Sequence, residues 1–131
     1  MPFTCTNLHV AGSDGQHWTL LEPFAYVTAV FPGELRKLVV PAVTQFDGAS
    51  TPRSIWHLIP PFGVYWRAAC LHDHLYRNTT MRREDADAVF LESMVALGVD
   101  QVTRETIYAA VRVAGEHAFE EDRNTSPAPA A

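Results

Sequence analysis

The sequence lacks closely spaced cysteines, an excess of basic residues and long apolar runs, and each absence excludes a class of protein. Its only cysteines, Cys5 and Cys70, have no close pairing, so they can build neither a disulfide framework nor a zinc ribbon. Ten basic residues stand against fifteen acidic ones, which gives a formal net charge of -5. Because a protein that neutralises phosphates needs a basic surface, we expect no nucleic-acid partner.

Long apolar runs are also missing. No stretch approaches the roughly 20 apolar residues that a membrane-spanning helix needs. The opening residues, MPFTCTNLHVAGSDGQHW, lack the basic and apolar regions of a signal peptide. We therefore expect a protein that is not transmembrane and that stays in the reducing compartment where it is made.

The first third of the chain has the pattern of β-strands. Residues 17–46 are rich in aromatic and β-branched side chains and are interrupted by the turn dipeptide Pro32-Gly33. They predict an antiparallel hairpin or a small meander. Pro41 cannot donate to a strand ladder, so we expect it at a sheet edge or a bulge.

The second half has the period of helices. The pattern predicts one helix over residues 65–77, a second over 82–97 and a third over 100–120. Thr80 is the expected N-cap of the second helix, and Gly98 is its expected C-cap.

Together these patterns predict an α+β fold in which a small N-terminal antiparallel hairpin or meander precedes a three-helix C-terminal half. A hydrophobic content of 47% is enough for one core. We expect a single globular domain over residues 1–121. The polar, proline-containing end over residues 122–131 has the composition of a disordered tail.

Two polar residues interrupt the apolar stripes of the first two helices. His72 shares its stripe with Tyr65, Ala69 and Tyr76, at intervals of three or four residues. Asp87 likewise falls in register with three apolar residues of the second helix: Phe90, Met94 and Leu97. Both positions would normally hold an apolar side chain.

A buried carboxylate needs a hydrogen-bond donor, because an unpartnered one costs several kcal/mol (about 3–5). If the two helices pack antiparallel, Asp87 accepts a hydrogen bond from one nitrogen of His72, and the other nitrogen can act as a general base. The alternatives are a core histidine held by a backbone carbonyl and a buried salt bridge from Asp87 to Arg67 or Arg83.

Three neighbours have weaker signals. Asp73 lies at the edge of the same face and is a candidate metal ligand. His74 is expected to point to solvent. Tyr76 is expected in the core, with its hydroxyl available to support the His72–Asp87 pair.

The segment FDGAST, residues 46–51, is a second candidate site. Asp47 and Ser50 could offer a carboxylate and a hydroxyl to a cation or an oxyanion. Alternatively, Asp47 ends the strand in an Asx-turn, and Ser50 or Thr51 caps the turn at Ser54. The apolar loop that follows either packs over the helices or forms the rim of a site. Three of its residues could contact a lipid surface: Trp56, Ile59 and Phe62.

Three segments of the chain resemble a family of short phage- and prophage-encoded proteins known as a domain of unknown function. The recurrent features VPxGFxTDGAS, AAxxHDxLY and RxxADxxFxxxM correspond here to Val40 to Ser50, Ala68 to Tyr76 and Arg83 to Met94. The resemblance implies a phage or prophage origin, and so a location in the cytoplasm of the bacterial host or in the virion. It implies no particular activity.

A narrower resemblance concerns the helices alone. CLHDHLYRN followed by DADAVFLESM is similar to the two active-site helices of secreted and microbial phospholipase A₂ enzymes. The resemblance implies that His72 activates water, that Asp87 orients His72, and that Asp73 binds a calcium cofactor.

We therefore expect a small hydrolase with a His72–Asp87 dyad, supported by Tyr76 and Arg83, that acts on a small-molecule ester or at a lipid surface. A cation near Asp73 and Asp47 would stabilise the oxyanion. One alternative is a non-enzymatic virion, assembly or lysis protein that contacts other phage proteins and uses the pair structurally. A lesser alternative, which needs His57 as a further ligand, is a metal-dependent His-Asp phosphohydrolase.

Overall fold

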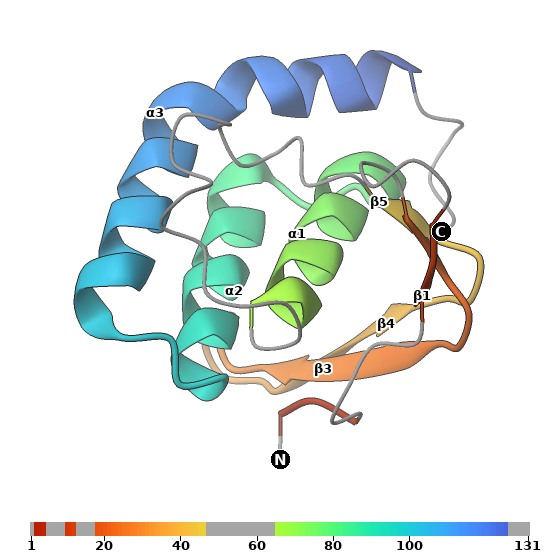
Figure 1. Ribbon diagram of the computed structural model, residues 1–131. Helices are drawn as coiled ribbons and strands as arrows, with labels where there is room; N and C mark the ends of the chain where they lie inside the picture. The colour runs from red at the N-terminus through yellow and green to blue at the C-terminus, as the bar shows by residue number, and fades with distance from the viewer. Residues whose placement is uncertain (1, 5–9, 13–17, 47–64, 126–131) are drawn as a thin grey trace.

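The computed structural model describes residues 2–4, 10–12, 18–46 and 65–125, with the backbone alone at position 46 and after 113. The strands are β1 (Val10–Ala11), β2 (Trp18–Leu20), β3 (Phe24–Thr28), β4 (Arg36–Val40) and β5 (Gln45–Phe46). The helices are α1 (Trp66–Asn78), α2 (Arg83–Ala96) and α3 (Gln101–Thr125). Antiparallel strands followed by three helices confirm the expected α+β fold (Figure 1).

The expected hairpin is formed by β3 and β4. The two strands pair antiparallel, with Phe24 opposite Val40 and Thr28 opposite Arg36. Gly33 has φ +80 in the connecting turn, a conformation that glycine adopts without a steric penalty. The Pro32-Gly33 turn is thus confirmed.

The segments on either side of the hairpin belong to a second sheet, because prolines interrupt the strands. Pro23 precedes β3, and β2 pairs instead with β1 and β5 in a three-stranded antiparallel sheet. The pattern predicted one strand through Pro41, but β4 ends at Val40 because proline cannot donate to the ladder. Val43 follows with φ 59, and its N–H donates to the Leu20 carbonyl at 2.7 Å.

The three helices begin and end close to the expected residues. Gly98 has φ +77 after α2, and the Val99 N–H donates to the Met94 carbonyl at 3.0 Å, which confirms the glycine cap. The Thr80 cap is wrong: Arg82 is the residue before α2, and no side chain caps this end. Helix α3 runs to Thr125, further than the pattern predicted.

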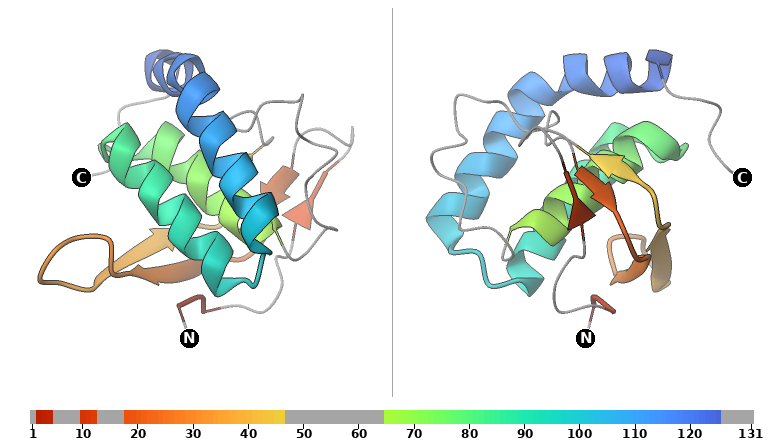
Figure 2. Two further views of the ribbon diagram at one scale, coloured as in Figure 1. Left: turned by 90° about the vertical axis from the view of Figure 1, so that its left-hand side faces the viewer. Right: turned by 45° about the vertical axis from the view of Figure 1, so that its right-hand side comes forward.

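The helices lie against one side of the hairpin and enclose a core of their own. Figures 1 and 2 show β3 and β4 beneath α1 and α2, while α3 follows α2 and then bends across the top. One apolar cluster joins the strands to α1 and α2. A second cluster lies among the three helices and includes Tyr65, Phe90, Met94, Ile107 and Val111. No helix in the described part of the chain is both long enough and apolar enough to cross a bilayer.

Candidate functional site

His72 lies in the interior of the helical half, as its stripe predicted. Its side chain has no solvent exposure. The imidazole stacks on the Phe90 ring, with centroids 4.3 Å apart and an interplanar angle of 15°, and it contacts the Tyr76 ring at 4.2 Å. Two aromatic rings therefore fix the orientation of the imidazole.

Asp87 is the partner of His72. Nε2 of His72 lies 2.7 Å from Oδ1 of Asp87, and both side chains are fully buried. The contact joins α1 to α2 across the short connection between them, which confirms the pairing expected from the two stripes. A catalytic role for the pair stays a prediction.

Tyr76 supports the same carboxylate oxygen. Its hydroxyl donates to Oδ1 of Asp87 at 2.5 Å. Burial raises the pKa of the Tyr76 phenol, and the neighbouring Asp87 raises it further. Tyr76 therefore stays protonated and acts as a donor, as expected.

Two arginines hold the second oxygen of Asp87. Nη1 of Arg83 lies 3.4 Å from Oδ2, and Nη1 of Arg112 donates to Oδ2 at 2.6 Å. Arg83 was an expected partner, whereas Arg112, on α3, was not anticipated. The other expected alternative, Arg67, has its guanidinium 5.2 Å from the centre of the Phe3 ring.

Arg83 also binds the backbone of α3. Its guanidinium donates to the carbonyls of Val111 and Arg112 at 3.3 and 3.2 Å. The same arginine thus ties Asp87 to the part of α3 that supplies Arg112.

The hydrogen bonds to Asp87 outweigh its burial. Desolvation raises the pKa of this carboxyl, but the bonds from His72, Tyr76 and Arg112 lower it more, and the resulting pKa is below its ordinary value. Asp87 is therefore ionised at neutral pH. One carboxylate, one imidazole, one phenol and two guanidinium groups meet at a single buried point.

The expected calcium site is only partly within the described residues. Asp73 is 2% exposed on α1, and Asp47 and Ser50 lie outside the described residues. Among the side chains that the structure describes, no three His, Cys, Asp or Glu residues gather as metal ligands. Calcium prefers about six to eight oxygen ligands. Asp73 alone therefore does not make a calcium site.

His74 differs from its expected position. It is buried, with 8% exposure, rather than solvent-facing. Its Nδ1 lies 3.2 Å from the Asn78 amide nitrogen, and it forms a hydrogen bond with the backbone of Val39 on β4. The helical pattern placed His74 off the α1 stripe correctly, but the hairpin covers this second face.

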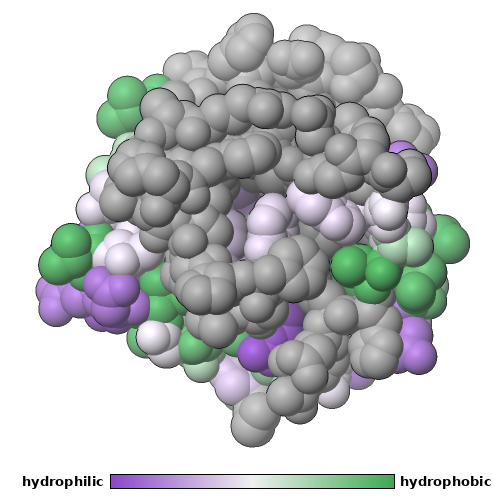
Figure 3. Space-filling view, in the orientation of Figure 1, coloured by the Kyte–Doolittle hydropathy of each residue, from purple (hydrophilic) through white to green (hydrophobic). Residues whose placement is uncertain are grey.

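The remaining expected site residues belong to the segment of the chain between β5 and α1. His57 and the apolar loop residues Trp56, Ile59 and Phe62 lie outside the described residues. In the described part, the exposed large hydrophobic side chains come from both halves of the fold: Leu21, Leu35, Val39, Val43, Val95, Val102 and Val113. Figure 3 shows hydrophobic groups at opposite edges of one face.

Comparison with known proteins gives a family but no activity. Residues 18–111 match the family described as "Protein of unknown function (DUF1353)". The uncharacterized protein y4jT of Sinorhizobium fredii is 35% identical over 81 residues, which are 60% of this chain. The chain spans about a quarter of the length of that relative, because the match covers 24% of it. No solved structure matches. The match includes β2 to β5, all of α1 and α2, and the first part of α3, and it ends one residue before Arg112. The chain therefore belongs to the DUF1353 family of proteins of unknown function.

Proposed function

We propose that the protein is a small hydrolase in which His72, oriented by Asp87, activates a water molecule. The supporting observation is the 2.7 Å contact between Nε2 of His72 and a fully buried carboxylate. A carboxylate with a lowered pKa keeps its charge and can stabilise an imidazolium that forms beside it. This is what a general-base histidine needs from its partner.

In the proposed mechanism, the contact with Asp87 leaves proton transfer to the other nitrogen of His72. Because Asp87 accepts from Nε2–H, the proton acceptor of the dyad is Nδ1. Water loses a proton to Nδ1 as its oxygen attacks the carbonyl carbon of an ester. The imidazolium returns that proton to the departing alkoxide, so the histidine is regenerated. Tyr76 and Arg112 keep Asp87 in place during both transfers.

The proposed substrate is a phospholipid or a smaller ester. The similarity of the α1 and α2 sequences to phospholipase A₂ favours the lipid, and the net charge of -5 favours a zwitterionic surface over an anionic one. In this proposal Asp73, next to His72 on α1, contributes to binding a calcium ion that would polarise the carbonyl when bound.

The test compares matched histidine variants. The full chain is incubated with phosphatidylcholine vesicles and with a soluble short-chain ester, with calcium and with a chelator, and released acid is titrated. We expect His72→Asn and Asp87→Asn to lose at least 100-fold in rate. His74→Asn, which alters the other buried histidine of α1, should retain the rate.

Two results would contradict the hydrolase. One is no acid release from either ester by the folded wild-type chain. The other is equal rates for wild type and His72→Asn. Loss of activity on chelation, restored by calcium, would support the role of Asp73, whereas an unchanged rate would remove calcium from the proposal and leave the dyad.

A second function is favoured by the complete burial of His72. In this proposal the protein is a non-enzymatic phage virion, assembly or lysis protein, and the Asp87 cluster fixes the register of the three helices. Asp87→Asn would then impair folding and particle assembly, and the wild-type chain would hydrolyse neither ester. Particle yields from a phage that carries His72→Asn, compared with its hydrolysis rate, separate the two functions.

A further inference from the structure

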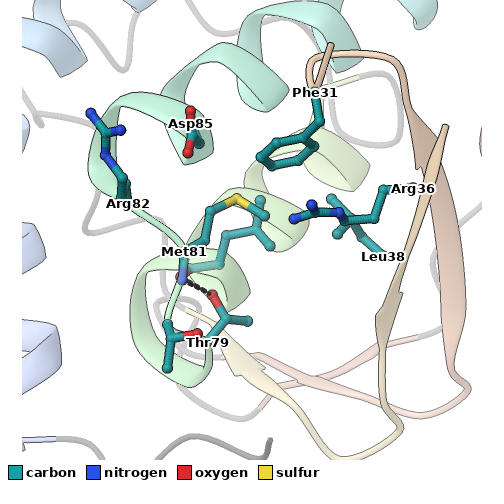
Figure 4. Close-up of a pocket in the computed structure, with 9 residues that line it drawn as sticks. Phe31, Arg36, Leu38, Thr79, Met81, Arg82 and Asp85 are labelled. Atoms are coloured by element: carbon teal, nitrogen blue, oxygen red, sulfur yellow. Dashed lines mark hydrogen bonds between the residues drawn. The ribbon is translucent and has the colours of Figure 1, made fainter. Parts of the chain in front are cut away.

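A second candidate site lies on the other side of α1, between the hairpin and the α1–α2 connection. Figure 4 shows this pocket. It has a volume of about 330 Å³ and is independent of the Asp87 cluster. Its main walls come from Phe31, Arg36 and Leu38 of the hairpin, and from Met81 and Asp85 of the connection and α2.

The floor of the pocket is apolar and firmly held. Leu75 is 1% exposed, and Leu38 and Met81 pack against the same core cluster. The volume is near the lower end of the roughly 300–1,000 Å³ typical of small-molecule sites. The pocket therefore suits a small ligand with a compact apolar group, rather than a protein segment or a whole lipid.

Opposite charges stand on opposite walls. The Arg36 guanidinium lies 3.7 Å from the Phe31 ring centre and pairs with Glu34 at 2.6 Å, so two contacts hold it in place. In Figure 4 the Asp85 carboxylate stands across the pocket, with Met81 between the two charges. The Asp85 side chain makes no hydrogen bond or ion pair with the residues that the structure describes.

This arrangement discriminates against ligands of a single charge. Arg82 also lines the pocket on the side of Asp85 and pairs with Glu84 at 3.5 Å, as Arg36 pairs with Glu34. An anion attracted to Arg36 therefore meets Asp85, and a cation attracted to Asp85 meets Arg36 and Arg82. A molecule that carries both charges satisfies both walls at once. A guanidinium has five donors, so Arg36 can bind a ligand carboxylate while it keeps Glu34.

We propose that this pocket binds a free apolar α-amino acid. Its carboxylate pairs with Arg36, its ammonium pairs with Asp85, and its side chain covers Leu38, Leu75 and Met81. The site needs no catalysis by His72 and holds whether or not the protein is a hydrolase.

The probe is L-leucine, titrated calorimetrically into the full chain. N-acetyl-leucine lacks the ammonium and leucinamide lacks the carboxylate, so each should bind at least tenfold more weakly, which is about 1.4 kcal/mol. Asp85→Asn and Arg36→Gln should each weaken leucine binding to a similar extent.

The protein variants and the blocked ligands can also be combined in a thermodynamic cycle, which tests whether Asp85 acts on the ligand ammonium. Asp85→Asn should not weaken N-acetyl-leucine further, because the charge that Asp85 would bind is already absent. Lys37→Gln, which removes the neighbouring cation on β4, is the matched control and should bind leucine as wild type does. All these residues lie at or near the surface, and thermal unfolding verifies that each variant is folded.

Three outcomes overturn the proposal. The first is no heat of binding at millimolar leucine. The second is N-acetyl-leucine or leucinamide binding as tightly as leucine. The third is leucine binding that Asp85→Asn and Arg36→Gln leave unchanged.

Discussion

Asp87 and Glu92 both belong to α2, yet they fasten it to its neighbours with different chemistry. Glu92 accepts hydrogen bonds from the Tyr26 and Thr28 hydroxyls at 2.8 and 2.7 Å, and from the Ala29 N–H at 3.0 Å. All three donors are neutral and lie on or just after β3. Asp87 is fully buried and binds an imidazole, a phenol and two guanidinium groups.

The different donors around Glu92 and Asp87 indicate which carboxylate only holds two elements together and which is a candidate for catalysis. Neutral donors around a half-buried carboxylate are sufficient to hold the hairpin against α2. Two cations and a histidine exceed what docking requires, and they bring a titratable group next to a fixed charge. The Asp87 region is therefore the better candidate for function, and the Glu92 region serves as its structural control.

The largest expected effect comes from removing each carboxylate. Asp87→Ala should lower the free energy of unfolding by about 3–5 kcal/mol, because it leaves buried charges without their partner. Glu92→Ala should cost about 2 kcal/mol, since Glu92 is itself only half-buried and the donors that it leaves are neutral rather than charged. Urea unfolding measures both. Equal losses in the free energy of unfolding would show that the two carboxylates contribute equally to stability.

The tyrosines sharpen the same comparison at a smaller scale. Tyr76→Phe removes a hydroxyl that donates to buried Asp87 and should cost about 1.5–2 kcal/mol. Tyr26→Phe removes the corresponding donor to Glu92 and should cost about 1 kcal/mol. Thermal unfolding of the two variants gives the order. A larger loss for Tyr26→Phe would contradict the stronger role assigned to the Asp87 cluster.

The smallest effect concerns pH. Burial lowers the pKa of His74 below its ordinary value of 6.5, although its hydrogen bond with Val39 opposes the shift. The unfolded chain therefore takes up a proton that the folded chain refuses, and stability falls as pH decreases from 6.5 towards the folded pKa. The slope should be at most about 1.4 kcal/mol per pH unit.

His74→Gln is the variant that tests this slope. It should flatten the stability profile just below pH 6.5 in urea unfolding, while Asp87, whose folded pKa is also lowered, keeps its contribution until about pH 4. An unchanged slope in His74→Gln would assign the pH dependence to another group.

Periodicity predicted the part of the site that local spacing controls. His72 and Asp87 could be paired from the sequence because each interrupts an apolar stripe, and a short connection limits how two helices can pack. Arg83 could also be predicted as a partner of Asp87, because it precedes Asp87 by one helical turn. Arg112 could not be identified, since ten basic residues are available and α3 packing alone selects among them.

The strand half was harder to predict because pairing partners are distant in the chain. The turn at Gly33 was visible, but not the division of residues 18–46 between two sheets. The burial of His74 was missed for the same reason: it forms a hydrogen bond with the backbone of Val39 on β4, which no spacing along α1 reveals.

The sequence by itself determined the three helices, the hairpin turn and the presence of two polar residues on apolar stripes, because these depend on contacts within a few residues. Only the tertiary structure decided that Asp87 also binds Arg112, that His74 is buried, and that Arg36 and Asp85 face each other across a pocket. Those relations depend on how α3 and the hairpin pack against α1 and α2, and packing joins residues whose separation in the chain carries no signal.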